Sequence, residues 1–289
     1  SSIASYLDYG SKNHFDISPV GPLLGVTFPE GPDFPPLEYN VLAAKVFSEE
    51  INLISRQQGP WHWTAGASYR DAKDQLLQQF IGVGNEDQST SFAVFGELSR
   101  KFFSDRLEWT AGARYFHDDE STTDLLPPPG VPVDHFTASF HAATPRLVLS
   151  WYPRSNLTAY ASYSQGFRSG FGQQPVILEA APQFPPVKPD KLHNYEIGSK
   201  GTLWDGRVSF DAAVYYIKWD DVQQSLTVLY QGATFGAFVN AQSASGAGEE
   251  FAVAARLAEG LDVGLNFSRN ELTFDADVEG KYQRALGMM

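Results

Sequence analysis

The chain has 289 residues, a formal net charge of −13 and no cysteine. An acidic balance argues against nucleic acid as a partner, because binding to the phosphate backbone needs clustered lysine and arginine, and the lack of cysteine removes disulfides and thiolate metal sites. No run of about 18 apolar residues occurs, so the sequence predicts no transmembrane helix; this does not exclude a membrane β-barrel, whose strands alternate.

Apolar and polar residues alternate with a period of two along much of the chain. In residues 107–115 the odd positions are apolar and the even ones are polar or small, and the pattern recurs in residues 157–164, 208–216 and 261–268. Such alternation is typical of strands in a sheet with one apolar and one wet face. We predict about eleven strands of roughly 13 residues, long enough to cross an outer membrane at the usual tilt.

The connections between these strands alternate between short and long. Short turn signals fall at residues 58–60, 103–105, 153–156, 205–206 and 259–260. Long polar or proline-rich stretches fall at residues 10–43, 72–89, 119–134, 168–191 and 220–235. Bacterial outer-membrane barrels have short periplasmic turns and long extracellular loops. The predicted fold is therefore all-β: a partial, antiparallel transmembrane β-barrel with this arrangement of turns and loops.

Aromatic residues gather near the ends of the predicted strands. They are Trp61, Trp63, Phe102, Phe103, Trp151, Tyr152, Trp204 and Trp219. This position is typical of the aromatic girdles that mark the two membrane interfaces of a barrel. Any one of them could instead belong to an ordinary β-rich core, but their coincidence with the turns favours the girdles.

Several sequence blocks resemble the barrel of TonB-dependent receptors. The most specific one combines residues 187–190 (Val-Lys-Pro-Asp), 194–200 (Asn-Tyr-Glu-Ile-Gly-Ser-Lys) and 205–207 (Asp-Gly-Arg), because the family repeats such a series in this order. Further similar blocks are residues 92–98, 110–115, 144–147, 160–170 and 239–251, and residues 48–53 extend the resemblance upstream. Together they cover about 200 residues from Phe92 onward.

The resemblance implies a barrel of about 22 strands with a lumenal plug domain, of which the predicted strands are about half. Residues 1–289 are thus expected to be an incomplete barrel, with the plug domain and the C-terminal strands absent. The implied function is TonB-dependent uptake of a scarce nutrient, most of all a ferric siderophore, with haem, cobalamin and oligosaccharides as other ligands. The implied location is the outer membrane of a Gram-negative bacterium, with its lipid, its lipopolysaccharide and the TonB complex as partners.

Two other functional classes stay open at this stage. One is a plug-free passive channel of the porin type or a fatty-acid channel. The other is a soluble β-protein that binds carbohydrate, against which the apolar faces of the strands argue, because soluble monomers do not expose apolar patches of that size. The sequence contains no recognisable nucleotide-binding, hydrolase or metalloprotease motif and pairs no nucleophile with a base, so we predict no enzyme, no catalytic residue and no cofactor.

A few charged residues can be given roles from the sequence. Residues 117–120 (His-Asp-Asp-Glu) could bind a divalent cation, but a solvated loop is the favoured interpretation for them and for Asp220-Asp221. Arg168, between Gly166 and Gly170, could touch a ligand, although a role in anchoring a loop is favoured. The polar residues expected to face the lumen, paired with one another or with a plug, are Glu108, Arg114, Lys200 and Asp211. No ligand-binding residue can be named from the sequence.

Overall fold

The computed structural model describes residues 1–16, 37–56, 59–78, 83–127, 135–173, 178, 185–230 and 233–276. Eleven strands form one antiparallel sheet, and their spatial order follows the chain. In order they are β1 (Ser2–Asp16), β2 (Leu37–Ile54), β3 (Trp61–Gln78), β4 (Val83–Phe102), β5 (Leu107–Asp124), β6 (His135–Arg154), β7 (Leu157–Arg168), β8 (Asp190–Leu203), β9 (Val208–Asp220), β12 (Ala244–Ala258) and β13 (Leu261–Phe274). The predicted all-β, antiparallel fold of about eleven strands is confirmed.

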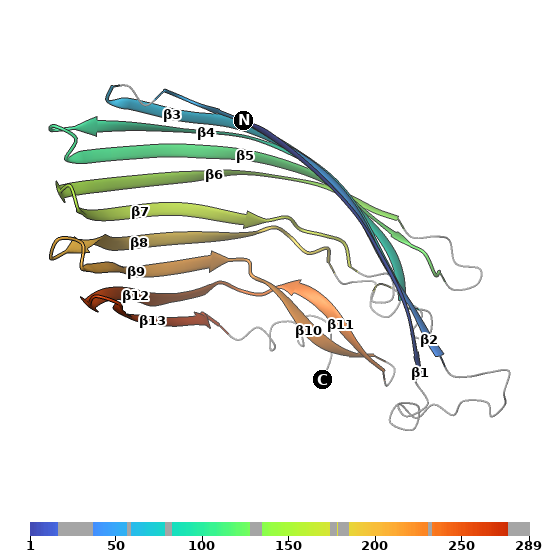
Figure 1. The fold of residues 1–289 in the computed structure, drawn as a ribbon. Coiled ribbons are helices and arrows are strands. Elements are labelled where there is room, and N and C mark those ends of the chain that lie inside the picture. The colour runs from blue at the N-terminus through green and yellow to red at the C-terminus, as the bar shows by residue number, and fades with distance from the viewer. Residues whose placement is uncertain are drawn as a thin grey trace.

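A second, two-stranded sheet interrupts the series between β9 and β12. It is the hairpin of β10 (Gln223–Tyr230) and β11 (Ala233–Asn240). In Figure 1 this hairpin stands apart from the long strands, at the end of the sheet where the N-terminal strand β1 finishes. Residues 220–235 were predicted to be a long loop. The structure shows instead that most of this stretch belongs to the hairpin.

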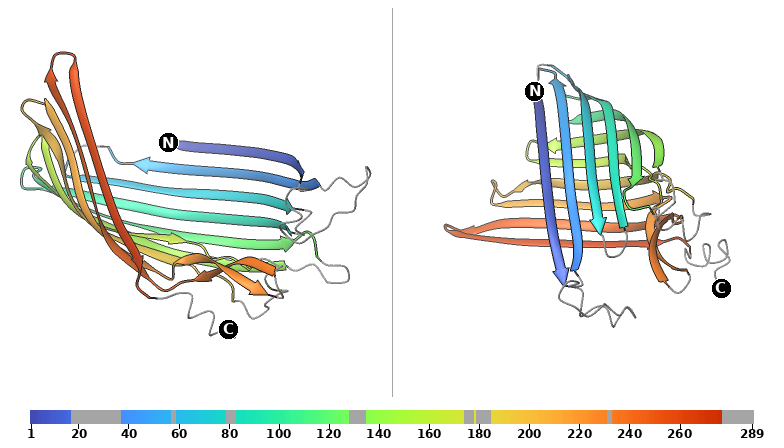
Figure 2. Two further views of the ribbon diagram at one scale, coloured as in Figure 1. Left: turned by 90° about the horizontal axis from the view of Figure 1, so that it is seen from below. Right: turned by 90° about the vertical axis from the view of Figure 1, so that its right-hand side faces the viewer.

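The sheet is strongly twisted and curved, so that it forms an open trough rather than a closed barrel (Figures 1 and 2). Figure 2 shows the first strands running across the direction of the last ones. Each strand is rotated relative to its neighbour by roughly 20–25° in an average sheet, so a large change of direction accumulates over eleven strands. Within the described part of the chain, β1 and β13 are the two edges of the sheet.

Short connections join the strands at one end of the trough, at residues 55–60, 103–106, 155–156, 204–207 and 259–260. The other end carries the long connections at residues 17–36, 125–134, 169–189 and 221–243. The stretch 72–89, predicted as a long loop, is different: β3 and β4 continue through it to the pair Gln78 and Val83. Polar residues occupy both faces there, which removes the alternation that a sequence reading detects, although the backbone pairing continues.

The convex face carries the apolar residues that the sequence alternation predicted to face outward. Leu147, Tyr163, Tyr195 and Tyr216 lie directly opposite one another in β6, β7, β8 and β9 and form one continuous row. Their exposure is high for apolar side chains, at 52% for Leu147, 50% for Tyr195 and 47% for Tyr216. A surface of this kind suits contact with lipid rather than with water.

Aromatic residues border this apolar face at the short-turn end. Trp61 and Trp109 pack edge to face with 6.1 Å between ring centroids, and the guanidinium of Arg100 lies 4.7 Å from the Trp61 ring. Phe103 and Trp204 project from the turns and are among the most exposed apolar residues. This arrangement agrees with the girdle predicted at the periplasmic end.

Two of the eight aromatic residues assigned to the girdles point inward instead. Tyr152 lies in the irregular part of β6, between the pairs formed by Trp151 and Arg154, and its hydroxyl donates a hydrogen bond to Glu108 Oε2 at 2.8 Å. Trp219 lies on the concave face of β9 and packs against a small buried cluster of Val222, Ala241 and Ala244. The face to which a side chain points depends on whether its position along the strand is odd or even, and not on how near it lies to the strand end.

The wall is a single layer, so the described residues contain few buried apolar side chains. No helix among them is long and apolar enough to cross a membrane.

The unpaired edges make a prediction for this 289-residue chain expressed alone. Among the described strands, β1 and β13 each pair on one side only, so no further described strand forms ladder hydrogen bonds with their outer edges. We expect the isolated chain to aggregate in water and, after refolding in detergent, to give no compact, heat-modifiable band on a gel. A stable heat-modifiable species would show that the two edges can be satisfied without further strands.

The assignment of the convex face to lipid can be tested at Ile197, which is 65% exposed. In the protein inserted in lipid vesicles, Ile197→Arg should lower the free energy of unfolding by about 2–4 kcal/mol if the position lies near the bilayer midplane. The matched control is Ser162→Arg, on the concave face directly opposite Glu196. Urea titrations in lipid vesicles measure both, and equal stability of the two variants would contradict the assignment.

Candidate functional site

The concave face of the sheet is lined by polar side chains, and the four charged residues expected in the lumen lie on it. Glu108 accepts the hydroxyl hydrogen bond of Tyr152. Lys200 and Asp211 lie directly opposite each other in β8 and β9. Arg114 extends over the ring of Phe116, with 5.4 Å between its guanidinium carbon and the ring centroid. These contacts support the interpretation that lumenal charges are satisfied by neighbours on the wall.

One ion pair of this face spans three strands. Glu97 of β4 and Arg146 of β6 are both opposite Gly112 of β5, and their side chains meet across it. A Cβ atom at Gly112 would lie only 3.4 Å from Cβ of Glu97 and 3.2 Å from the carbonyl oxygen of Gly96. The glycine therefore leaves the space through which the arginine reaches the carboxylate.

Other glycines of the concave face are covered by aromatic rings from the adjacent strand. The pairs are Phe95 over Gly66, Tyr160 over Gly198 and Tyr215 over Gly248, and a side chain at any of these glycines would collide with the ring. The hydroxyl of Tyr160 also donates a hydrogen bond of 2.6 Å to Glu196 Oε1. Such cross-strand coverage of glycine fixes the register of a sheet that has no opposing layer to pack against.

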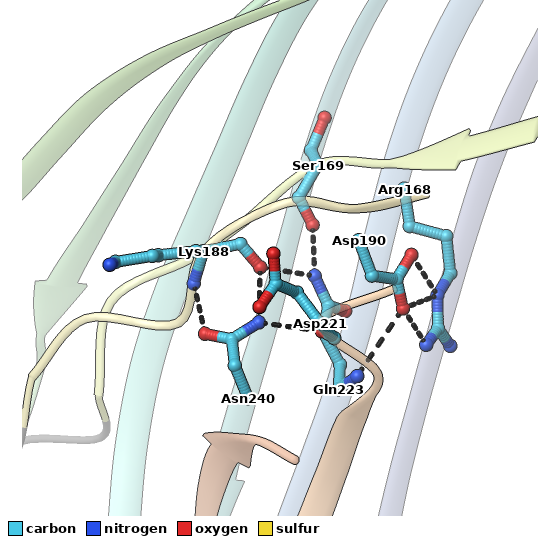
Figure 3. A network of polar contacts seen from close by, with 7 residues as sticks. All are labelled: Arg168, Ser169, Lys188, Asp190, Asp221, Gln223 and Asn240. Atoms are coloured by element: carbon cyan, nitrogen blue, oxygen red, sulfur yellow. Dashed lines mark hydrogen bonds and ion pairs between the residues drawn. The ribbon is translucent and has the colours of Figure 1, made fainter. Parts of the chain in front are cut away.

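At the long-connection end, Arg168 forms a salt bridge with Asp190, which joins the end of β7 to the start of β8 (Figure 3). Nε of Arg168 donates to Asp190 Oδ2 at 2.9 Å and to Oδ1 at 3.1 Å. The guanidinium also lies 4.8 Å from the ring centroid of Trp219. The Asp190 side chain is only 2% exposed. This geometry supports the anchoring role favoured for Arg168.

Two side-chain amides extend the anchor into the neighbouring loops, as Figure 3 shows. Gln223 donates its backbone N–H to Asp190 Oδ2 at 3.3 Å and its side-chain amide to the carbonyls of Ser169 and Lys188, at 2.7 and 3.1 Å. Asn240 binds the Lys188 backbone in both directions, with its amide donating at 2.8 Å and its oxygen accepting at 2.7 Å. The sequence offered no signal for Gln223, and for Asn240 only its place in the block at residues 239–251 that resembles TonB-dependent receptors, because the partners of both amides are distant in the chain.

We call residues 169–173, residues 185–189 and the hairpin β10–β11 the loop layer. It reaches the barrel wall through Ser169, whose hydroxyl donates to Asp118 Oδ2 of β5 at 2.7 Å. Gly170 lies so close to the backbone of Val187 and the ring of Phe140 that no side chain fits there. The amide of Gln173 donates to the carbonyl of Phe238 at 2.5 Å, which ties the two loops together.

A cavity of about 300 Å³ lies between the loop layer and the wall formed by β3, β4 and β5. Its charged lining comes from the wall, and its two aromatic rings come from the loop layer. These residues are Arg70, Asp74, Asp87, Glu120, Phe171 and Phe238. A larger and more open recess of about 970 Å³ lies along the concave face of β7, β8, β9, β12 and β13.

The pKa values of two glutamates at this end of the wall are shifted in opposite directions. Glu86 is bound by Lys73 at 2.6 Å, and hydrogen bonds from Lys73 and Gln75 lower its pKa to about 2. Burial, followed by the neighbouring carboxylates of Asp118 and Asp87, raises the pKa of Glu120 to about 8. Burial and the charge of Asp87 also raise the pKa of Asp74. The polar residues on the outward face here place these groups beyond the apolar belt.

The four residues at 117–120 do not form a single site. They belong to β5 rather than to a loop, so successive side chains point to opposite faces. His117 Nε2 lies 3.2 Å from Asp119 Oδ2 on one face, while Asp118 is buried on the other and accepts a hydrogen bond from Ser89. Of the described residues, no group of three or more His, Cys, Asp or Glu is placed to hold a metal ion.

The other acidic pair is divided between a strand end and a turn. Asp220 ends β9 and pairs with Lys218 at 3.3 Å, and Asp221 offers its backbone carbonyl to Asn240 at 2.9 Å. The residues predicted to be a solvated loop therefore take part in holding the hairpin.

The anchor can be tested by Arg168→Ala. The change leaves the buried Asp190 without its cation, and because Arg168 is half exposed we expect a loss of about 1–3 kcal/mol in the local stability of the loop layer. Limited proteolysis of the folded protein should then cut this layer several-fold faster. Arg269→Ala, which removes an exposed pair with Glu271, is the control. Unchanged cleavage in Arg168→Ala would contradict the anchoring role.

Comparison with solved structures supports the fold. The copper transporter OprC matches with a TM-score of 0.67 at 13% identity, covering 96% of this chain and 43% of that one. The ferric yersiniabactin uptake receptor FyuA from Yersinia pestis matches with a TM-score of 0.60 at 18% identity, covering 83% and 37%. The siderophore receptor PiuA from Acinetobacter baumannii matches with a TM-score of 0.62 at 12% identity, covering 82% and 39%. The chain thus spans about two fifths of these relatives.

The family model described as "TonB dependent receptor-like, beta-barrel" matches residues 3–286, which is nearly the whole chain. Together with the curved antiparallel sheet, the outward apolar face and the polar concave face, this match shows that the chain belongs to the family of TonB-dependent receptor-like β-barrels.

Proposed function

We propose that this chain is part of the barrel of an outer-membrane receptor in a Gram-negative bacterium, which binds a ferric siderophore at the cell surface and imports it. Import would depend on the TonB complex, which would act through a plug domain inside the barrel. The surrounding lipid and lipopolysaccharide would contact the convex face. The strands and the plug that complete such a receptor would be supplied by the rest of the protein.

The observation that carries the proposal is the loop layer over the concave wall. Loops held by the buried Asp190 and by side-chain amides leave a cavity at the long-connection end of the barrel, where a ligand from outside would arrive first. A rigid loop layer lowers the ordering cost of ligand capture. Among the structural relatives, FyuA is described as a ferric yersiniabactin uptake receptor, PiuA as a siderophore receptor and OprC as a copper transporter. Uptake of a metal chelate therefore fits the geometry and the family.

The two other functional classes are less well supported. A soluble carbohydrate-binding protein would not present exposed rows of Leu, Tyr and Trp such as those through Leu147 and Trp151. A passive channel needs an open mouth, whereas the loop layer of this chain folds against the wall and is bonded to Asp118.

The test is growth on ferric siderophores as the sole iron source. Deleting the gene that encodes the receptor should abolish uptake of radioactive iron from at least one siderophore, and a plasmid copy should restore it. The same plasmid in a strain without TonB should give no uptake, because the proposed import needs energy from the inner membrane. Undiminished uptake without TonB would favour the passive channel and overturn the proposal.

A further inference from the structure

The cavity beneath the loop layer has more negative than positive charge. Asp74, Asp87 and Glu120 reach it from three adjacent strands, and the cation among the described residues that line it is Arg70. None of the ion pairs found in the described part of the chain involves these three carboxylates. A neighbouring carboxylate on the opposite face, Glu86, is in contrast neutralised by Lys73.

The side-chain amide of Asn85 adds a hydrogen-bond acceptor to the same cavity, and no donor among the described residues reaches it. Asn85 lines the cavity, and its side-chain oxygen is fully buried with no hydrogen-bond partner. The orientation of this amide is fixed, because its nitrogen donates to Asp87 Oδ2. A buried acceptor left unpaired costs free energy, roughly 1–3 kcal/mol in typical cases. Asp87 accepts hydrogen bonds from Asn85 and from the Thr122 hydroxyl, the latter at 2.6 Å, but both donors are neutral. The Asn85 oxygen has no donor among the described residues.

The other residues that line the cavity favour an organic cation over a metal ion as its ligand. A divalent cation needs several convergent ligands, and no group of three or more His, Cys, Asp or Glu among the described residues is placed to hold one. Two aromatic rings, Phe171 and Phe238, close the cavity instead, packed edge to face with 5.3 Å between centroids. Phenyl rings attract ammonium and guanidinium groups and pack against the carbon atoms that carry them.

We propose that this cavity binds a protonated amine or guanidinium group, with Asp87, Glu120 and the Asn85 oxygen as acceptors and Phe171 and Phe238 as the apolar wall. The inference rests on the proposed function and specifies it: the imported ligand carries an organic cationic arm. A volume of about 300 Å³ accommodates such an arm but not a whole metal chelate of ordinary size.

The electrostatics of the empty cavity agree with this assignment. Burial and the neighbouring carboxylates of Asp118 and Asp87 raise the pKa of Glu120 to about 8, and burial with Asp87 raises that of Asp74. Burial is the largest cause of both shifts, and the neighbouring negative charges add to it. A bound cation would offset those charges.

The experiment is calorimetric titration of the complete receptor, purified in detergent, with spermidine as the probe. We expect saturable binding of spermidine and none of 1,8-octanediol, which has similar length and no charge. Asp87→Asn and Glu120→Gln should each weaken binding by about tenfold or more, because the first removes a negative charge and the second a carboxyl group that a bound cation would hold ionised. Mg²⁺ at equal concentration should not compete.

Asp119→Asn is the matched control, since it removes one charge from the neighbouring position on the opposite face of β5. Its affinity for spermidine should equal that of the unchanged receptor. Heat-modifiable mobility identifies any variant that fails to fold, and the comparison of spermidine with octanediol on the unchanged receptor then still decides the question. Absence of spermidine binding, equal weakening in Asp119→Asn, or displacement by Mg²⁺ would overturn the assignment.

The growth experiment separates this inference from the proposed function. If siderophore uptake needs the receptor while spermidine does not bind, the cation assignment fails and the receptor proposal stands. If spermidine binds with the expected dependence on Asp87 and Glu120 but no siderophore is taken up, the cavity assignment stands and the choice of siderophore fails.

Discussion

Backbone hydrogen bonding between adjacent strands is the constraint on which this structure depends. Lipid offers no partners for N–H and C=O groups, so each strand in the membrane must be satisfied by its neighbours. Strand pairing extends over the whole sheet, from Ser2 opposite Ile51 in β2 to Phe251 opposite Phe267 in β13, with register shifts only near strand ends in β6 and β12. Since side chains alternate along every strand, the register also decides which residues meet lipid and which face the lumen. The row from Leu147 to Tyr216 and the lumenal position of Arg114 follow from the same pairing.

A single-layer wall cannot rely on a conventional core, and the concave face shows what replaces it. Aromatic rings cover glycines on the next strand, as Tyr160 does at Gly198, and a charged pair crosses Gly112 to join β4 to β6. Both devices need a residue without a side chain at one defined register position. A one-residue slip would move these groups to the lipid face. The glycines of the wall thus help to specify how the strands pair. In proteins with two packed layers, packing between the layers serves this purpose.

The features that depend on local alternation could be predicted from the sequence, and those that depend on distant contacts could not. Residues 107–115 and 208–216 could be assigned to strands, with the correct faces, because one face meets lipid and the other meets water. Residues 72–89 were misassigned to a loop, since above the lipid both faces are wet and the pattern disappears while pairing continues. Tyr152 and Trp219 were assigned to the girdles because they lie near strand ends. Their position along the strand, odd or even, turns them to the concave face instead. The contacts of Gln223 and Asn240 could not be predicted, although residues 239–251 resembled the family, because their partners, Ser169 and Lys188, lie about 50 residues away.

The loop layer connects these structural devices to ligand capture. Its position is set before any ligand arrives, because the buried Asp190 is bonded to Arg168 and to the backbone of Gln223, and Asn240 holds the Lys188 backbone in both directions. Loops ordered by the fold itself do not have to be ordered by the ligand, so more of the interaction free energy appears as affinity. The same order keeps the Glu120 carboxylate in a confined space beside Asp118 and Asp87, at the positions that the β4–β5 register imposes. The negative character of the cavity is therefore a consequence of strand pairing in the wall and of amide contacts in the loops. A ligand that supplies the missing positive charge would bind to a site whose shape is already formed.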